Sequence, residues 1–145
     1  MTAVKNNARA LWNGDLFTGS GTVELVSSGA ATFDVNFKAR SEDGAKGPVT
    51  TPEELIAAAH ASCYAMAFSN ALKENGTAPV SLDVSAEVVF ENVTITTSTL
   101  TVVAEVPGID ADKLREVAEA AKEGCPVSKA LAGVEIILAD ATLKA

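Results

Sequence analysis

The chain of 145 residues carries a net charge of −8, and 48% of its residues are hydrophobic. The length predicts one domain over residues 1–145, and the hydrophobic share is enough to build a substantial core. Because no basic patch interrupts the acidic balance, the composition argues against nucleic-acid binding.

The polar N-terminus, MTAVKNNARALWNGD, lacks the apolar segment of a secretory signal peptide. The longest apolar run, residues 55–72, is interrupted by four polar side chains, whereas a membrane span needs about 20 mostly apolar residues. These features predict a cytoplasmic protein with no membrane partner. In the reducing cytosol, cysteines are more often catalytic, metal-binding or buried than joined in a structural disulfide.

Alternation of apolar and polar residues predicts three strands in the first forty residues, because successive side chains of a strand point to opposite faces. The first strand spans residues 8–14 and ends in the turn signal Asn13-Gly14, and residues 21–28 and 32–39 follow. We expect these strands to form an antiparallel meander. The glycines, proline and charged residues of segment 40–50 predict a loop.

A long helix is predicted next, from Pro52 to the stop signal Asn75-Gly76. Thr51 is a suitable N-cap, and Glu54 completes a Thr-x-x-Glu capping box. The helix is rich in alanine and apolar on almost every side. We therefore expect it to be central and buried.

The second half of the chain predicts further strands and helices, in the overall order βββ-α-ββ-α-α-β. This order indicates the α+β class rather than a parallel alternating fold. The elements are strands at 81–91 and 93–106, an amphipathic helix at 110–124, a short helical turn from Cys125-Pro126 to Leu131, and a strand at 134–143.

Two cysteines occupy different local settings. Cys63 lies in the middle of the long helix, where burial raises the pKa of a thiol and no helix end lowers it. Cys125 precedes Pro126 and is placed to cap the short helix, so that backbone N–H groups face its sulfur. Local physics thus predicts the more acidic thiol at Cys125.

Simpler interpretations of these residues stay open at this point. Both cysteines can be packing residues, since free cysteine is among the most buried residue types. His60 and Cys63 share a helix face and can form a partial metal site with Cys125, although a lone histidine in an apolar helix is more often a core residue. Glu53 is most simply a helix-start residue, and Arg40 a solvated loop residue.

Two segments about sixty residues apart, TTPEELIAAAHASCYAMAFS and GCPVSKAL, together resemble the signature segments of the OsmC/Ohr family (osmotically inducible protein C and organic hydroperoxide resistance protein). The resemblance covers the whole chain, because LWNGDLFTGSGTV is similar to the family's first hairpin. It implies an OsmC-like α+β fold, with antiparallel sheets around a long buried helix. It also implies an intertwined homodimer with its sites at the interface.

The resemblance implies a thiol-dependent peroxidase that reduces organic hydroperoxides and, more weakly, hydrogen peroxide. It makes Cys63 the peroxidatic cysteine, which becomes a sulfenic acid, and Cys125 the resolving cysteine, which forms the disulfide. An external dithiol resets the pair, and no cofactor or metal is expected. These roles reverse the local ranking of the thiols, and we follow the resemblance because a nearby arginine can outweigh a helix end in a buried site.

The family pairs an arginine near the sulfur with a glutamate at the start of the long helix, and PEE matches that glutamate at Glu53. In the Ohr-like branch the arginine follows the first turn, where NGDLFTG has none. In the OsmC-like branch it precedes the loop before the helix, where NFKARSEDG supplies Arg40. We therefore assign the OsmC-like branch, with Arg40 as the activating cation and Arg9 as the alternative.

Two other functions remain possible. The chain can be a carrier that binds an apolar small molecule at the dimer interface, or a stress protein without catalysis. Apolar residues around Cys63, among them Met66 and Phe68, predict a pocket that suits a bulky peroxide better than hydrogen peroxide.

Overall fold

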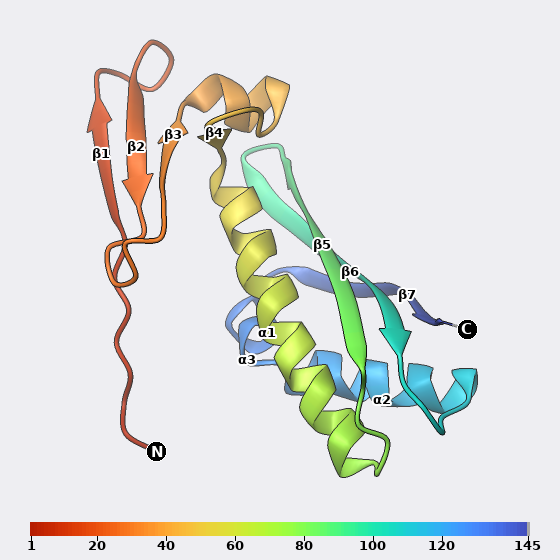
Figure 1. Cartoon of the computed structure of the whole chain (residues 1–145). Helices are drawn as coiled ribbons and strands as arrows, with labels where there is room; N and C mark the ends of the chain where they lie inside the picture. The colour runs from red at the N-terminus through yellow and green to blue at the C-terminus, as the bar shows by residue number, and fades with distance from the viewer. Residues whose placement is uncertain (145) are drawn as a thin grey trace. The chain divides into compact units, whose positions relative to one another are not determined.

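The computed structural model describes residues 1–144. The chain divides into two compact units, Met1–Glu54 and Leu55–Ala145. Each unit has its own β-sheet (Figure 1). The single domain expected from the length stays a prediction.

The observed elements confirm the α+β class and the predicted order of the main strands and helices. They run in the chain order β1 (Arg9–Asn13), β2 (Ser20–Glu24), β3 (Thr32–Val35), the π-helical turn η1 (Ala39–Asp43), β4 (Val49–Thr50), α1 (Pro52–Glu74), β5 (Ser81–Glu91), β6 (Thr94–Glu105), α2 (Ala111–Gly124), α3 (Pro126–Ala130) and β7 (Glu135–Leu143).

The first unit holds a four-stranded sheet in the order β1-β2-β3-β4. The β1–β2 and β2–β3 pairs are antiparallel, which confirms the meander, and β4 pairs with β3 in parallel. Close packing of β1 on β2 requires a glycine at position 21, because a Cβ atom there would lie 2.2 Å from the carbonyl oxygen of Leu11. Two strands predicted to be longer end early, β2 at Glu24 and β3 at Val35.

The loop predicted for residues 40–50 is wrong in part, because β4 and all but the first residue of η1 lie within it. Side-chain hydrogen bonds stabilise the start of η1. The Asn36 Oδ1 accepts from the Ala39 N–H at 2.7 Å, and the Ser41 hydroxyl donates to the Phe37 carbonyl at 2.9 Å. Glycine and proline content shows where a chain turns, but it does not reveal such local bonds.

The predicted N-cap and stop residues of α1 are confirmed, whereas Glu54 bonds Thr50 in place of the return bond that a capping box makes to the N-cap N–H. At its start, the Thr51 hydroxyl oxygen accepts from the Glu54 N–H at 3.1 Å, as an N-cap does, and the Glu54 carboxylate accepts from the Thr50 hydroxyl. At its end, Gly76 adopts a positive φ of 83°, and its N–H donates to the Lys73 carbonyl at 3.0 Å. A glycine in this conformation is a common helix stop.

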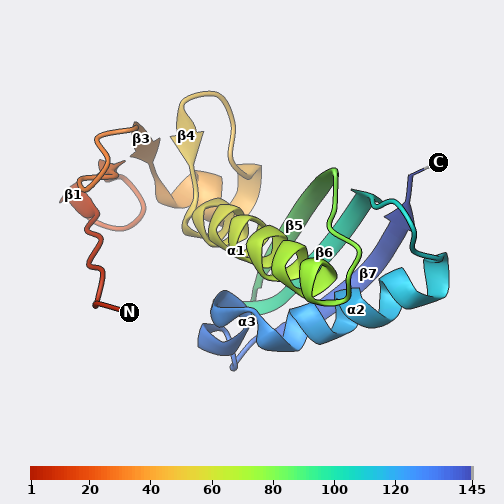
Figure 2. The same cartoon turned by 60° about the horizontal axis from the view of Figure 1, so that its bottom comes forward.

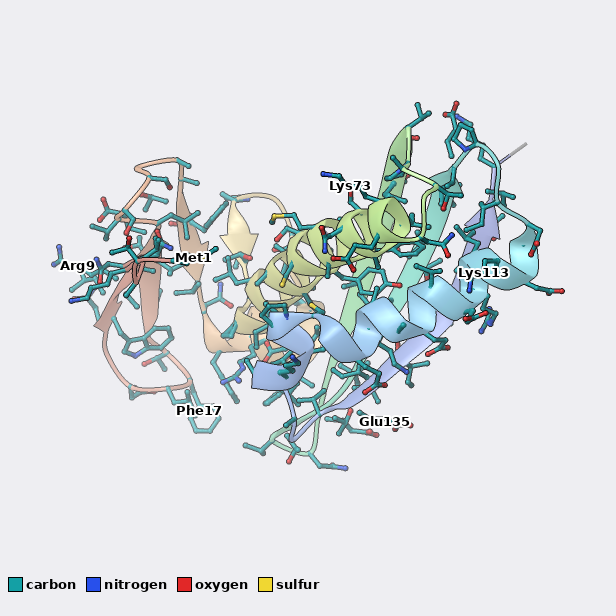
Figure 3. The ribbon with its side chains drawn as sticks, turned by 90° about the horizontal axis from the view of Figure 1, so that it is seen from below. Met1, Arg9, Phe17, Lys73, Lys113 and Glu135 are labelled. Carbon is teal, nitrogen blue, oxygen red and sulfur yellow. The ribbon has the colours of Figure 1, made fainter. Side chains whose placement is uncertain are left out.

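In the second unit, α1 and α2 lie on one face of the sheet β5-β6-β7 (Figure 2). The β5–β6 pair is antiparallel and the β6–β7 pair is parallel. Side chains of both helices and the strands fill the space between them (Figure 3). The wholly buried members of this core include Tyr64, Phe68, Leu72, Leu100, Val102, Ala104, Leu114, Ala118 and Cys125.

The helix α1 is covered along one line within the single chain. His60, Tyr64, Phe68 and Leu72 recur every four residues and are fully buried, whereas Met66 is 69% exposed. Phe68 therefore belongs to the core, and the prediction that it lines a pocket beside Cys63 was wrong. By length and composition α1 also qualifies as a membrane span, but its buried line packs against the sheet.

Adjacent valines on β6 test this placement of the core. Val102 is fully buried, whereas its neighbour Val103 is 41% exposed. We expect Val102→Ala to lower the free energy of unfolding by about 2–3 kcal/mol, because it removes buried apolar volume and leaves a cavity. The matched change Val103→Ala should cost less than about 1 kcal/mol. Urea unfolding at one protein concentration measures both, and equal losses would contradict the assignment.

Candidate active site

The second unit brings the two cysteines together. The sulfur atoms of Cys63, on α1, and Cys125, at the start of α3, lie 3.3 Å apart. Both are free thiols, and Cys125 is fully buried while Cys63 is half-buried. A pair that is far apart in sequence thus becomes a contact pair, at a separation from which small side-chain movements can form a disulfide.

Cys125 is held at the junction of α2 and α3. Its N–H donates to the Ala121 carbonyl at 2.9 Å, and its own carbonyl accepts from the Lys129 N–H at 3.1 Å. Pro126 then occupies the first position of α3, where its missing N–H costs no hydrogen bond. This corner turns the N–H groups of Val127 and Ser128 towards sulfur.

The two thiols differ in acidity. Burial raises the pKa of Cys63, the Val127 N–H partly opposes it, and the neighbouring Cys125 raises the pKa further. Burial acts on Cys125 in the same direction. Hydrogen bonds outweigh it there, chiefly from the Ser128 N–H, the Cys63 thiol and the Ser128 hydroxyl, so the pKa of Cys125 lies below its usual value. The local prediction that Cys125 is the more acidic thiol is confirmed.

The raised pKa of Cys63 means that its thiolate needs a further stabilising group. Burial is the largest influence on its pKa within the second unit, and it acts against the thiolate. A nucleophilic Cys63 therefore needs an additional positive charge near its sulfur.

His60 is also part of this cluster. Its ring is fully buried, with Nδ1 2.6 Å from the Ser98 hydroxyl oxygen and Nε2 2.8 Å from the Ser128 hydroxyl oxygen. Burial lowers the pKa of His60, which favours the neutral imidazole. Both ring nitrogens thus face hydroxyl groups, and within residues 1–144 no three His, Cys, Asp or Glu side chains gather as metal ligands do.

Sequence reasoning treated His60 as a core residue or a partial metal ligand and missed its serine partners. Ser128 had a recognisable signal, because it lies three residues after Cys125 at the start of a helix. Ser98 had none, because nothing in an alternating strand identifies which residue will face a histidine.

In the first unit, Arg40 and Glu53 form the predicted pair. The Nε and Nη2 atoms of Arg40 both donate to Oε1 of Glu53, at 3.0 and 2.9 Å. The Glu53 side chain is only 7% exposed, and its Oε2 atom has no hydrogen-bond partner among residues 1–144. Neither residue is therefore merely a solvated loop or helix-start residue. Their relation to the thiols stays a prediction.

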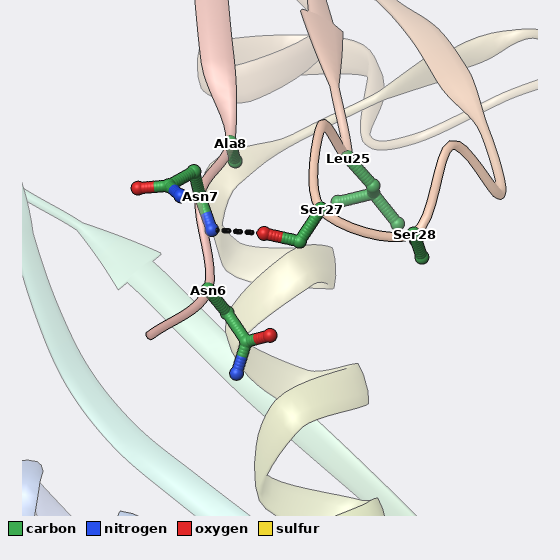
Figure 4. Close-up of a pocket in the computed structure, with 6 residues that line it drawn as sticks. All are labelled: Asn6, Asn7, Ala8, Leu25, Ser27 and Ser28. Carbon is green, nitrogen blue, oxygen red and sulfur yellow. Dashed lines mark hydrogen bonds between the residues drawn. The ribbon is translucent and has the colours of Figure 1, made fainter. Parts of the chain in front are cut away.

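The alternative cation, Arg9, is exposed on the edge strand β1, opposite Glu24 of β2. A hollow at the base of the same sheet is lined by Asn6, Asn7, Ala8, Leu25, Ser27 and Ser28, and the Asn7 N–H donates to the Ser27 hydroxyl oxygen at 2.6 Å (Figure 4). These six lining residues include no thiol, imidazole or charged side chain. The hollow therefore offers none of the predicted chemistry.

Comparison with known proteins agrees with the resemblance seen in the sequence. The family model described as OsmC-like protein matches residues 42–139. The chain is 42% identical to the peroxiredoxin OsmC of Escherichia coli (strain K12) over 132 residues, which covers 88% of this chain and 90% of that protein.

Solved structures give the same result for the fold. An organic hydroperoxide resistance protein OsmC from Legionella pneumophila superposes with a TM-score of 0.70 at 23% identity, covering 98% of this chain and 99% of that one. The organic hydroperoxide resistance protein OhrB of Bacillus subtilis superposes with a TM-score of 0.65 at 26% identity, covering 95% of this chain and 98% of that one. With the matched family model and a relative at 42% identity over most of its length, the chain belongs to the OsmC family.

Proposed function

We propose that the protein is a thiol-dependent peroxidase that reduces organic hydroperoxides, with Cys63 as the peroxidatic cysteine and Cys125 as the resolving one. The observation that carries the proposal is the 3.3 Å contact between a half-buried and a fully buried thiol. Similarity to a peroxiredoxin supports a peroxide-related redox function. The cytoplasm is the proposed location, since reducing equivalents for dithiols are abundant there.

In the first step, the Cys63 thiolate attacks the terminal oxygen of the hydroperoxide. A sulfur–oxygen bond forms, the oxygen–oxygen bond breaks, and the alkoxide that leaves takes up a proton to become an alcohol. The sulfur loses two electrons and becomes a sulfenic acid. The half-buried position of Cys63 supports this role, because its sulfur is the more accessible of the two.

In the second step, the Cys125 thiolate attacks the sulfur of the sulfenic acid. The disulfide forms, hydroxide leaves, and a proton converts it to water. An external dithiol then returns two electrons and regenerates both thiols. The lowered pKa of Cys125 supports its role here, because a larger fraction is present as the attacking thiolate.

We further propose Arg40 as the cation that stabilises the Cys63 thiolate, with Glu53 orienting its guanidinium group. Two lines support this assignment: the resemblance to the OsmC-like branch, and the two hydrogen bonds between Arg40 and a buried carboxylate. These two hydrogen bonds restrain the orientation of the guanidinium group of Arg40.

We propose a homodimer for the assembly. The second unit leaves an apolar side of α1 uncovered, which includes Ala58, Ala59 and Met66. Exposed apolar area on a helix of this length is a common feature of subunit interfaces. The unpartnered Oε2 atom of Glu53 also suits a donor from outside the chain, because a buried carboxylate oxygen without a hydrogen bond is unfavourable.

The proposed function predicts a substrate preference. A bulky apolar tail gains about 25 cal/mol for each Å² of apolar surface it buries, and hydrogen peroxide has no such surface. We therefore expect a higher kcat/KM for cumene or tert-butyl hydroperoxide than for hydrogen peroxide, in a protein that sediments as a dimer at assay concentration. Steady-state kinetics on the two substrates, with sedimentation of the same sample, tests both expectations.

A clear preference for hydrogen peroxide, or a fully active monomer, would contradict this account of the pocket. A carrier function makes a different prediction for the same sample. Alkylation of Cys63 would leave a carrier able to bind an apolar ligand, and the unmodified protein would consume no peroxide. The matched control is the Cys63→Ser variant treated with the same alkylating reagent, which keeps only the thiol of Cys125.

A further inference from the structure

A continuous line of polar side chains leads from the sheet to the resolving sulfur. Ser98 on β6 contacts Nδ1 of His60 at 2.6 Å, and Nε2 of His60 contacts the Ser128 hydroxyl at 2.8 Å. Ser128 lies three residues after Cys125 at the start of α3, and hydrogen bonding from its N–H and its hydroxyl lowers the pKa of the Cys125 thiol. Ser98 and His60 are wholly buried and Ser128 is 9% exposed, so the line is shielded from solvent.

We infer that Ser98, His60 and Ser128 form a positioning relay that holds Cys125 ready to resolve the Cys63 sulfenic acid and later to leave from the disulfide. The inference rests on the proposed function for the roles of the two cysteines. The relay itself rests on the contacts of the three side chains.

The direction of the hydrogen bonds follows from the chemistry of the groups. A neutral imidazole has one N–H donor and one acceptor nitrogen. If Ser128 donates its hydroxyl proton to the sulfur, its oxygen is open to accept from His60 Nε2–H. Nδ1 then accepts from the Ser98 hydroxyl. In the opposite tautomer, Nε2 carries no proton and accepts the hydroxyl proton of Ser128. The Cys125 thiolate would then lose the Ser128 hydroxyl as a donor.

The neutral state of His60 suits this arrangement, since burial lowers the pKa of its imidazole. Each hydrogen bond along the line polarises the next one, and such effects are stronger in a buried setting. The relay stabilises the negative charge of the Cys125 thiolate, since Ser128 lowers the pKa of Cys125 and has no such effect on Cys63. The relay thus acts on resolution and not on the first oxidation.

The same relay acts when the disulfide is reduced. The external dithiol meets the more exposed sulfur, that of Cys63, because Cys125 is fully buried. A thiolate of the external dithiol bonds to the Cys63 sulfur, the disulfide breaks, and Cys125 leaves as a thiolate. The second thiol of the reductant then releases Cys63 and completes the two-electron transfer. A stabilised leaving thiolate departs faster, so the relay accelerates this step as well.

The test uses three changes in the relay and one outside it. Ser128→Ala removes the hydroxyl donor. His60→Leu removes the ring donor, while His60→Gln keeps an N–H group near the position of Nε2 and should restore part of the effect. Ser28→Ala is the control, because this exposed serine lies in the first unit, where its hydroxyl oxygen accepts from the Ala30 N–H at 3.2 Å.

Two readouts separate the relay from a structural role. One is the pKa of Cys125, measured by thiolate absorbance in a Cys63→Ser background. The other is the rate of disulfide formation compared with the rate of the first oxidation. We expect Ser128→Ala and His60→Leu to raise the pKa of Cys125 by about one unit and slow disulfide formation up to about tenfold at neutral pH. The first oxidation should change by less than about twofold, and Ser28→Ala should change neither the pKa nor either rate.

An unchanged pKa and resolution rate in both relay variants would overturn the inference. Equal slowing of both steps would also overturn it, because that is the signature of a general structural defect. Failure of the proposed function is visible separately. If the wild-type protein formed no sulfenic acid with an organic hydroperoxide, the proposed roles of the two cysteines would be wrong. The comparison of Cys125 pKa values would still show whether the relay acts on Cys125.

Discussion

Replacing Cys63 by serine is expected to abolish peroxide consumption, by a factor on the order of 10³ or more. The physical reason is that a serine hydroxyl is not ionised at neutral pH and is a poor nucleophile towards an oxygen–oxygen bond. We do not expect Cys125 to take over the first step, since it is fully buried. Its lower pKa makes it a good second nucleophile but gives it no access to a peroxide.

Replacing Cys125 by serine is expected to have a different effect. The first oxidation should proceed once for each chain and then stop at the sulfenic acid, which a dimedone-type reagent labels. Consumption of one equivalent of peroxide without turnover is the measurable result. The opposite outcome, in which the Cys63 variant keeps the first oxidation and the Cys125 variant loses it, would reverse the assigned roles.

Removing the charge of Arg40 is expected to have the second largest effect. Burial already raises the pKa of Cys63, so loss of the cation should raise it further. One additional unit of pKa, about 1.4 kcal/mol, reduces the thiolate fraction about tenfold at pH values below the pKa. Arg40→Met should therefore slow the first oxidation about tenfold near neutral pH, and the difference should vanish at high pH, where the thiol is ionised in both proteins.

The pH dependence of the first oxidation measures this effect directly. Arg115→Met is the matched control, since Arg115 lies on α2 and only approaches Asp140, at 3.8 Å. Arg40→Lys should recover part of the rate, because it keeps the charge but not the two-donor geometry towards Glu53. A profile that is the same in Arg40→Met and in the wild type would assign the activation to another group, with Arg9 as the next residue to change.

Local patterns in the sequence were sufficient for most of the fold. The strand at 81–91 and the helix ends at Thr51 and Gly76 could be predicted because alternation, capping residues and a helix-stop glycine act within a few residues. The π-helical turn η1 and the short strand β4 could not be predicted in this way. They depend on single side-chain hydrogen bonds and on a parallel partner strand, which leave no periodic signal.

The candidate site was predictable in its residue types and less so in its contacts. The acidity of Cys125 followed from a proline that starts a helix, which is a local feature. The contact between Cys63 and Cys125 depends on how α1 packs on the sheet beside α2 and α3. The residues alone suggested it only within a partial metal site, and the family resemblance was needed to suggest a redox pair. The contact of His60 with Ser98 depends on the same packing, and it was missed.

The central claim is that Cys63 and Cys125 form a reversible redox pair, and the intact mass of the protein tests it most directly. The reduced wild type is treated with one equivalent of cumene hydroperoxide and measured before and after, beside the two cysteine variants. We expect the wild type to lose the mass of two hydrogen atoms as the disulfide forms, and to regain it when a dithiol is added. The Cys125 variant should gain one oxygen atom, and the Cys63 variant should not change. A wild-type mass that stays constant, or that only gains oxygen, would contradict the redox pair.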